Sequence, residues 1–267
     1  MSKPKKILVD GHVHLYPVYN YAKALKAGMK NISKLSSSPN CSFVFLLTER
    51  SDCHFYRDVT ESTLASNNDL AIEKNEQDHS LTVKSQKNEQ VLYIIAGRQI
   101  VSRENLEICA LFTDCRIDDR QLSTEELIHT VLGFNGIPVI NWAPGKWFGR
   151  RGNLVESLLY SYTPKQLWIG DTTMRPQLWP TPTLMKKAQQ QGYHLIAGSD
   201  PLPFKEEEQM LGSYATLVDG TLDPVRPAAS LRGILLSSGK VMPLGKRSRL
   251  FTFLRRQSKI MSNKTRR

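Results

Sequence analysis

The sequence predicts an α/β fold whose polar residues gather at the ends of its strands. Two observations lead to this prediction. Short apolar runs alternate with segments whose apolar residues recur at helical spacing. The conspicuous polar clusters come directly after the apolar runs, where strands would end. In barrels and open α/β sheets this carboxyl-end edge is where active sites form.

The first predicted strand is the apolar run Ile7-Leu8-Val9, which leads into Asp10-Gly11-His12-Val13-His14. Side chains alternate faces in extended chain, so His12 and His14 point the same way. Two imidazoles on one side of a strand end suit the first two ligands of a divalent metal. The alternative is that two polar residues simply leave the core as the strand ends.

A helix and a second strand follow. Residues 19–35 place apolar residues at helical spacing, and Cys41 to Leu47 is a continuous apolar run that ends in Thr48-Glu49-Arg50. This order is a β-α-β unit, so we expect the first two strands to be parallel.

Residues 70–111 have a different character, with short β-like runs separated by polar turns. We predict an antiparallel β-ribbon here, inserted into the α/β frame or leaning on it.

The α/β alternation then returns. Ser123 and Glu126 form a capping box at the start of a helix. Three strand-loop-helix units follow, with strands at 137–141, 167–170 and 193–197. The last one ends in Gly198-Ser199-Asp200, and the following Pro201-Leu202-Pro203-Phe204 is expected to form an apolar wall of the pocket.

Other polar residues after these strands are candidates for the site. Lys146, Arg150 and Arg151 lie in a Gly-rich loop before a helix expected from about Leu154, an arrangement that suits phosphate or carboxylate. The alternative is an exposed basic loop. Asp171 is a candidate general base or outer ligand, or a cap for the loop that follows it.

The excess of positive charge lies in a C-terminal tail. The chain holds 36 basic and 25 acidic residues, and residues 240–267 hold ten of the basic ones and no acid. We therefore divide the chain into a domain at 1–239 and a basic tail at 240–267, whose first part is expected to be a helix. The tail is either a solvated extension or a contact for nucleic acid or anionic membrane.

Composition also limits the classes of protein. No apolar run approaches the roughly 18 residues of a membrane span, so we expect no transmembrane segment. The N-terminus lacks the pattern of a signal peptide. Four cysteines without Cys-x-x-Cys spacing predict reduced thiols and a cytoplasmic protein.

Two of these motifs carry a resemblance to a known family. Asp-Gly-His-Val-His at the first strand and Gly-Ser-Asp near the last resemble the polymerase and histidinol phosphatase (PHP) family of metal-dependent phosphoesterases. The likeness spans roughly residues 7–204. It implies a distorted (β/α)7, TIM-like barrel related in outline to amidohydrolases. The intermediate segments that stand where the family has its other motifs are 46–50, 95–100, 106–111 and 139–144.

The departures from the family pattern reduce the expected ligand set. Arg50, Trp142, Leu202 and Glu107 stand where the family has histidines, and Gln99 stands where it has a bridging Glu. His12, His14 and Asp200 match unchanged, while Glu49 replaces an Asp. The resemblance therefore implies one divalent ion, Zn, Mn or Fe, held by His12, His14 and Asp200 with Glu107 as a further ligand.

The first hypothesis is a metal-dependent hydrolase that acts on a phosphoester or another small anionic substrate through a metal-activated water. Asp171 or Glu49 would move the proton, and Lys146, Arg150, Arg151 and Arg50 would hold the anion. The alternative is a catalytically inactive relative that binds an anionic ligand or partner. A third, nucleic-acid-binding reading rests on the basic tail alone and lacks a recognised motif.

Overall fold

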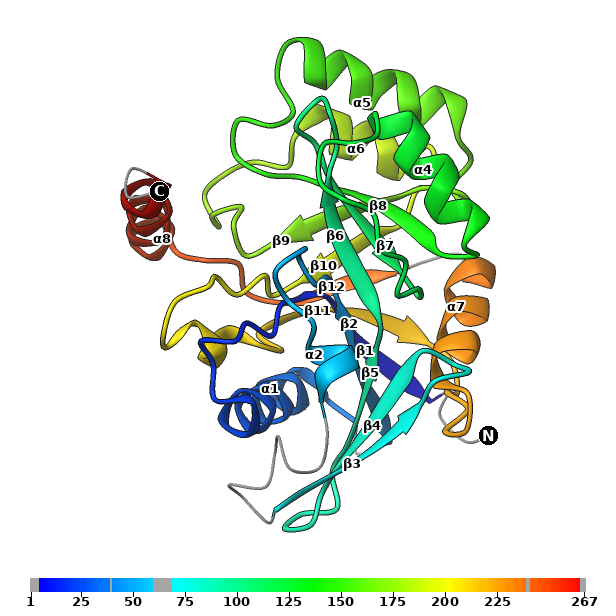
Figure 1. Cartoon of the computed structure of the whole chain (residues 1–267), viewed down its shortest axis with the longest axis vertical. Helices are drawn as coiled ribbons and strands as arrows, with labels where there is room; N and C mark the ends of the chain where they lie inside the picture. The colour runs from blue at the N-terminus through cyan, green and yellow to red at the C-terminus, as the bar shows by residue number, and fades with distance from the viewer. Residues whose placement is uncertain (1–4, 39, 60–68, 239–240, 265–267) are drawn as a thin grey trace.

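Two mixed β-sheets form the centre of the molecule, with helices around them (Figure 1). The structure is a computed structural model that describes residues 5–38, 40–59, 69–238 and 241–264. The seven strands of the first sheet, in spatial order, are β12 (Met242–Gly245), β11 (Tyr214–Asp219), β1 (Lys6–Val13), β2 (Cys41–Leu47), β5 (Val91–Ile95), β4 (Ser80–Ser85) and β3 (Leu70–Asn75). The five strands of the second sheet are β10 (Leu195–Gly198), β9 (Trp168–Thr172), β8 (Ile137–Asn141), β7 (Glu107–Leu111) and β6 (Gly97–Val101).

The predicted β-α-β unit at the start of the chain is confirmed. β1 and β2 are parallel, and α1 (Tyr21–Leu35) connects them. The helix begins after Asn20, whose side chain accepts a hydrogen bond from the Lys23 backbone N–H. This cap satisfies one of the N–H groups that a helix start leaves free.

The predicted (β/α)7-type barrel is wrong. A barrel of that type needs parallel strands in one closed ring. Here β1 pairs antiparallel with β11, and β7 pairs antiparallel with both β6 and β8. The described strands form two separate sheets, which meet where β10 lies beside β1 and where Glu49 bridges to Arg98.

The predicted ribbon is also wrong in its extent. β4 pairs antiparallel with both β3 and β5, but β5 joins β2 in parallel and so belongs to the first sheet. β6 and β7 form an antiparallel hairpin in the second sheet. The segment 70–111 therefore crosses from one sheet to the other.

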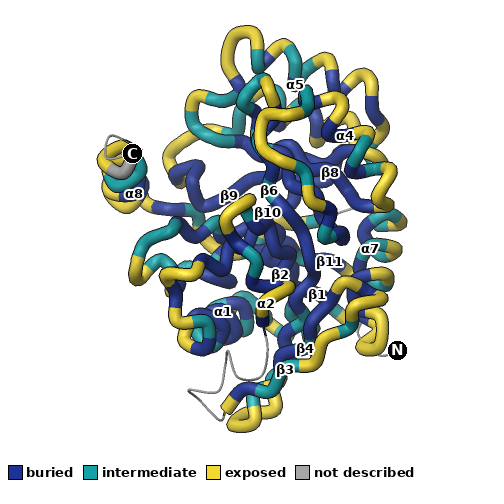
Figure 2. Tube along the Cα trace, viewed as in Figure 1, coloured by how far each residue is buried: buried dark blue, intermediate teal, exposed yellow. Residues whose placement is uncertain are grey.

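The helices cover the sheets and close the core, and the strands they cover are the most deeply buried part of the chain (Figure 2). The predicted capping box at Ser123 and Glu126 is confirmed. One buried cluster joins α4, α5 and α6 to the second sheet, and another lies between the two sheets and is closed by α7. The helices after α1 are α2 (Phe55–Asp58), α4 (Thr124–Gly133), α5 (Arg150–Ser161), α6 (Thr183–Gln190), the 3-10 helix η1 (Glu207–Met210), α7 (Pro227–Ser237) and α8 (Leu250–Lys264).

The basic C-terminal segment is ordered where it is described. Its first part is β12, which pairs with β11, and its second part is α8, which stands at one side of the molecule (Figure 1). None of the helices in the described ranges is long and apolar enough to cross a membrane.

Candidate metal centre

Three side chains converge at the junction of the two sheets. His12 and His14 come from the end of β1, and Asp200 follows β10. His12 Nε2 and His14 Nε2 are 3.0 Å apart, and each is 3.6 Å from Asp200 Oδ1. No other group of this kind with three or more His, Cys, Asp or Glu ligand atoms occurs among the described residues.

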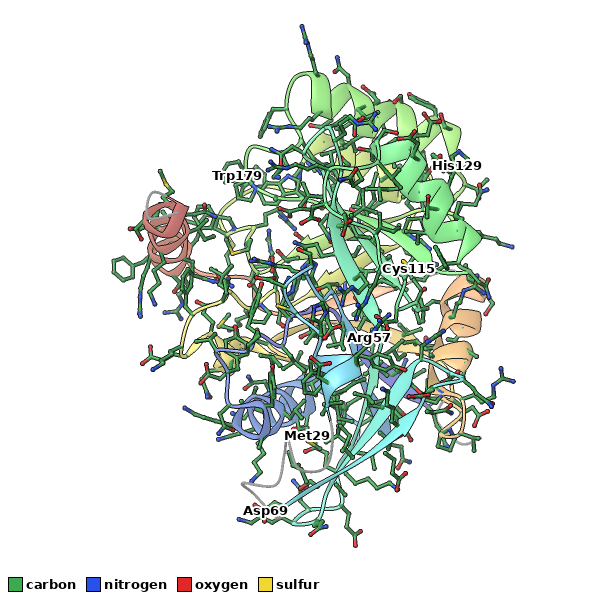
Figure 3. All side chains as sticks on the ribbon, viewed as in Figure 1. Met29, Arg57, Asp69, Cys115, His129 and Trp179 are labelled. Carbon is green, nitrogen blue, oxygen red and sulfur yellow. The ribbon has the colours of Figure 1, made fainter. Side chains whose placement is uncertain are left out.

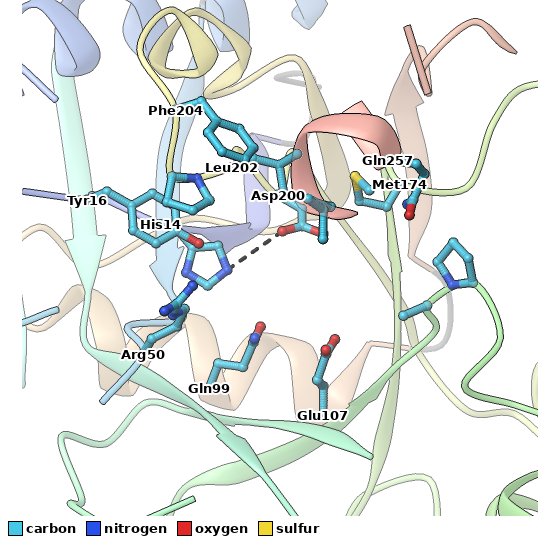
Figure 4. Close-up of a pocket in the computed structure, with 14 residues that line it drawn as sticks. His14, Tyr16, Arg50, Gln99, Glu107, Met174, Asp200, Leu202, Phe204 and Gln257 are labelled. Atoms are coloured by element: carbon cyan, nitrogen blue, oxygen red, sulfur yellow. Dashed lines mark ion pairs between the residues drawn. The ribbon is translucent and has the colours of Figure 1, made fainter. Parts of the chain in front are cut away.

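The spacing of these three atoms fits a bound metal ion. Ligand atoms around a tetrahedral zinc ion with bonds near 2.0–2.1 Å stand about 3.4 Å apart. The observed separations of 3.0, 3.6 and 3.6 Å bracket that value. Both imidazoles are buried, while the Asp200 side chain is 18% exposed and opens the centre toward the pocket (Figure 4).

Two glycines allow the ligand strands to approach each other. A Cβ on Gly198 would lie 2.3 Å from both the backbone nitrogen and the Cβ of His12. A Cβ on Gly11 would lie 2.1 Å from Ile196 Cγ2. The Gly residues in Asp-Gly-His and Gly-Ser-Asp are therefore what permits β1 and β10 to lie close enough for a shared site.

A buried carboxylate ties the two motifs together. Asp10 is fully buried and accepts backbone N–H bonds from Ser199 and Gly212 at 2.8 Å and from His12 at 3.3 Å. Burial raises the pKa of Asp10 to about 6, because desolvation outweighs these bonds. Asp10 is thus a positioning residue that joins the ends of β1 and β10 to the loop before β11.

Asp200 is held in an unusual backbone conformation. Its φ is +48°, in the left-handed region that disfavours a residue with a Cβ. Its N–H donates to the His12 carbonyl, and its Oδ2 accepts from the Thr172 hydroxyl at 3.0 Å. The Arg256 guanidinium of α8 donates to the Asp200 carbonyl at 2.6 Å. These bonds leave Oδ1 free to face the two imidazoles.

A side chain behind His12 sets the orientation of that imidazole. His12 Nδ1 lies 3.3 Å from Asn141 Oδ1, at the end of β8. When the amide oxygen accepts the Nδ1 proton, Nε2 carries the lone pair that a metal needs. The Asn141 amide in turn donates to Cys109 Sγ at 2.7 Å.

Burial and the neighbouring charges shift the pKa values of the two imidazoles in opposite directions. Burial disfavours the charged form of His12, but Asp200, Cys109 and Glu107 together outweigh it and raise the pKa of His12 to about 10. Burial, with the charge of His12, lowers the pKa of His14 to about 3. A divalent cation at this site would require both Nε2 atoms to be deprotonated, because a ligand nitrogen must carry a free lone pair.

The centre opens into a pocket of about 330 Å³ (Figure 4). His14 and Asp200 form part of its wall, and Tyr16 stacks on His14 with ring centroids 5.1 Å apart. The predicted apolar wall after Asp200 is confirmed, and the inner face of α8 completes the enclosure. The lining side chains besides those two ligands and Tyr16 are Arg50, Gln99, Glu107, Ala143, Pro144, Met174, Leu202, Pro203, Phe204, Gln257 and Ile260.

Comparison with solved structures shows which fold this is. The sequence matches no protein-family model and no curated protein. PsfC from Pseudomonas syringae is similar over 91% of this chain and 92% of its own, at 16% identity and a TM-score of 0.57. A two-domain protein from Bacteroides vulgatus, described as containing a predicted PHP-like metal-dependent phosphoesterase, is similar over 91% of this chain at 14% identity and a TM-score of 0.50. The chain therefore shares the fold of these two proteins. It spans 66% of the two-domain protein.

Two predicted site residues line the pocket in addition to His14 and Asp200. Arg50 does so while bound to Asp52, with its guanidinium 5.7 Å from the centre of the Tyr16 ring. Glu107 points into the pocket, and its carboxylate lies 3.6 Å from Lys146 Nζ.

The predicted anion loop lies beside the pocket instead of in its lining. Lys146 donates to the backbone and side-chain oxygens of Asn105 at 2.9 Å. α5 begins at Arg150, four residues before the expected start. Arg150 is exposed, and Arg151 donates to the Gly145 carbonyl.

The two predicted proton carriers are buried in ion pairs. Glu49 pairs with Arg98 at 3.0 Å and accepts the Tyr56 backbone N–H. Asp171 holds Arg175 through both carboxylate oxygens, at 2.8 and 2.6 Å. Neither is among the described residues that line the pocket.

Sequence reasoning missed Asn141, Thr172 and Arg256. Asn141 and Thr172 end β8 and β9, the same strand-end position that identified the other candidates. Arg256 lies in the segment interpreted as a basic tail. The sequence does contain a pattern that could have identified Arg256. Phe253, Arg256 and Ile260 fall on one face of the helix, and two apolar residues on that face indicate that it packs against the domain.

Proposed function

We propose that this protein is a PHP-family metal-dependent hydrolase that cleaves a phosphoester through a single divalent ion. The observation that carries the proposal is the convergence of His12, His14 and Asp200 at the base of a pocket, with spacings that fit a metal ion. Zn²⁺, Mn²⁺ and Fe²⁺ all accept two imidazoles and a carboxylate. Such an ion supplies a water whose pKa is lowered enough to attack at neutral pH.

Arg50 is the residue that we propose binds the anionic group of the substrate. Of the described residues lining the pocket, it is the one with a fixed positive charge. Its guanidinium lies beside Tyr16, which stacks on the ligand His14. The facing apolar side chains, which include Met174 and Phe204, would hold the remainder of the substrate and exclude water from it.

Glu107 is the residue that we propose moves the proton. Glu107 and Asp200 are the two carboxylates among the described lining residues, and Asp200 would be occupied as a ligand. The Glu107 carboxylate is therefore placed to accept a proton from the attacking water. We do not assign that step to Glu49 or Asp171, because both are fully buried in ion pairs with Arg98 and Arg175 and neither lines the pocket.

The alternative is a protein that binds an anionic ligand without turnover. The observation that favours it is the replacement of further family ligand positions by Arg50, Gln99 and Glu107, all of which line the pocket. An uncharged Gln99 facing Arg50 suits recognition of an anion better than assembly of a second metal site.

Metal analysis combined with an activity assay tests both proposals. The protein is purified without a His tag, its metals are measured by mass spectrometry, and hydrolysis of an aryl phosphate is followed. His12→Ala and His14→Ala should lose metal and activity together. His129→Ala is the matched control, because His129 is exposed on α4 (Figure 3) and is not among the described residues that line the pocket. Metal without turnover would favour the binding alternative, and wild-type protein that binds no added Zn²⁺, Mn²⁺ or Fe²⁺ would refute the metal centre.

We also propose that the protein works in the cytoplasm. Its four cysteines are free thiols. Free thiols are typical of a reducing compartment.

A further inference from the structure

The outer face of α8 exposes large apolar side chains. Phe251 is 80% exposed and Leu254 is 54% exposed, and Leu250 and Met261 are exposed with them. At about 100° per residue these four positions fall within an arc of about 100° on the helix. These four apolar side chains therefore lie on one side of the helix, with exposed Ser258 between Leu254 and Met261, and we call this side the α8 outer face.

This exposure does not come from a loosely attached helix. The opposite face of α8 is firmly packed, with Phe253 and Arg256 buried and Ile260 lining the pocket. Arg256 donates to the Thr173 hydroxyl at 2.8 Å and forms an ion pair with Glu207 at 2.9 Å. The inner face thus fixes the helix and directs the α8 outer face to solvent.

A neighbouring loop extends the exposed apolar surface. Leu178 and Trp179 are exposed, and Trp179 lies on the same side of the molecule as α8 (Figure 3). Gln177 holds this loop against the chain that enters α8, through bonds to the Ser248 carbonyl at 2.9 Å and the Arg247 carbonyl at 2.7 Å.

The charge beside this surface is mainly positive. Residues 240–267 contain ten basic residues and no acidic one. On α8 itself, exposed Arg255 lies next to the α8 outer face, with Glu206 at 3.9 Å as its ion-pair partner, and exposed Arg249 precedes the helix. Lys259 lies farther round the helix, with its Nζ 5.5 Å from the centre of the Phe204 ring. A partner that matches this surface would therefore be both apolar and anionic.

We propose that α8 docks this protein on the surface of an anionic lipid bilayer. A helix with Phe and Leu on one face and Lys and Arg beside it is typical of helices that lie in the membrane interface. Its basic residues would meet anionic headgroups while the α8 outer face enters the acyl boundary. Nucleic acid would match the charge but would leave Leu250 and Leu254 exposed to water.

Docking by α8 would also place the pocket beside the membrane. Gln257 and Ile260 of the same helix line the pocket, and Arg256 holds the backbone of Asp200. The docking proposal does not depend on the metal centre, because Phe251 and Leu254 are exposed and do not line the pocket.

Vesicle co-sedimentation tests the proposal in the full-length protein. Wild type should bind vesicles of phosphatidylcholine mixed with phosphatidylserine, bind pure phosphatidylcholine weakly, and dissociate as salt is raised. The double variant Phe251→Ser/Leu254→Ser should bind at least about tenfold more weakly, since two apolar side chains no longer leave water. Its melting temperature should stay unchanged, because both side chains are exposed.

Two controls make the result specific. Phe134→Ser removes an aromatic side chain that is 56% exposed at the end of α4, and it should bind like wild type. His12→Ala should also bind like wild type, which separates docking from the proposed metal chemistry. Equal binding of neutral and anionic vesicles, wild-type binding by the double variant, or binding to duplex DNA but not to vesicles would each overturn the proposal.

Discussion

Gly198→Ala provides the sharpest test of how β1 and β10 form the candidate centre. The added Cβ would lie 2.3 Å from the backbone nitrogen and the Cβ of His12, whereas ordinary contacts begin at 3.4 Å. The two strands would have to separate by about 1 Å, and the obstacle is backbone that cannot rotate away. Overpacking costs about 1–3 kcal/mol, and a backbone clash belongs at the upper end, so we expect a loss of about 3 kcal/mol in the free energy of unfolding.

The same shift would move His12 relative to Asp200, so bound metal should fall along with stability. Urea unfolding followed by tryptophan fluorescence measures the first effect, and mass spectrometry measures the second. Gly233→Ala is the matched control, because Gly233 is exposed within α7 and an added Cβ meets nothing within 4 Å. That variant should gain about 0.5–1 kcal/mol from helix propensity. If Gly198→Ala is as stable as wild type and keeps its metal, the inference that β1 and β10 need a glycine at position 198 to approach each other is refuted.

Three further substitutions test the residues around the centre. Asp10→Ala should lower the free energy of unfolding by about 3 kcal/mol in urea unfolding, because three backbone N–H groups lose a buried acceptor. Asn141→Ala should weaken Zn²⁺ binding by about 10–100-fold in calorimetric titration while the fold persists, because His12 loses the group that orients it; unchanged affinity would contradict this role. Burial raises the pKa of Glu49 to about 7, so its folded form retains a proton that the unfolded form has lost, and stability declines as pH rises from about 5 to 7. Glu49→Gln should make that decline shallower in unfolding measured across this range, and an identical slope would exclude Glu49 as its source.

The local structure of the fold could be predicted from sequence, but the pairing of strands that are far apart in the sequence could not. The β1–α1–β2 unit and the capping box at Ser123 depend on residues a few positions apart, and both are present. The antiparallel pairing of β1 with β11 joins residues about 210 positions apart. The apolar pattern of neither strand specifies that the two strands pair with each other. The predicted barrel therefore came from the family resemblance and not from the residues of the strands.

In the candidate site, too, relations between residues close in sequence were predictable, and contacts between residues far apart in sequence were not. His12 and His14 share a face because they are two residues apart, and Asp200 joined them through its matching motif at a strand end. The ion pairs that occupy Glu49 and Asp171 were not visible, because Arg98 and Arg175 carry no mark in the sequence that assigns them a partner. Charged residues at strand ends look alike until their neighbours are known.

The central position of β1 has a consequence for the order in which the protein assembles. β1 is made before the other described strands, yet its antiparallel neighbour β11 ends at Asp219, and the helix that fixes Asp200 follows later still. During synthesis one edge of β1 therefore remains unpaired until β11 has been made, and an open apolar edge favours wrong pairing. The candidate centre can form only after Asp200 has been made, because His12 and His14 lie far before that residue in the sequence.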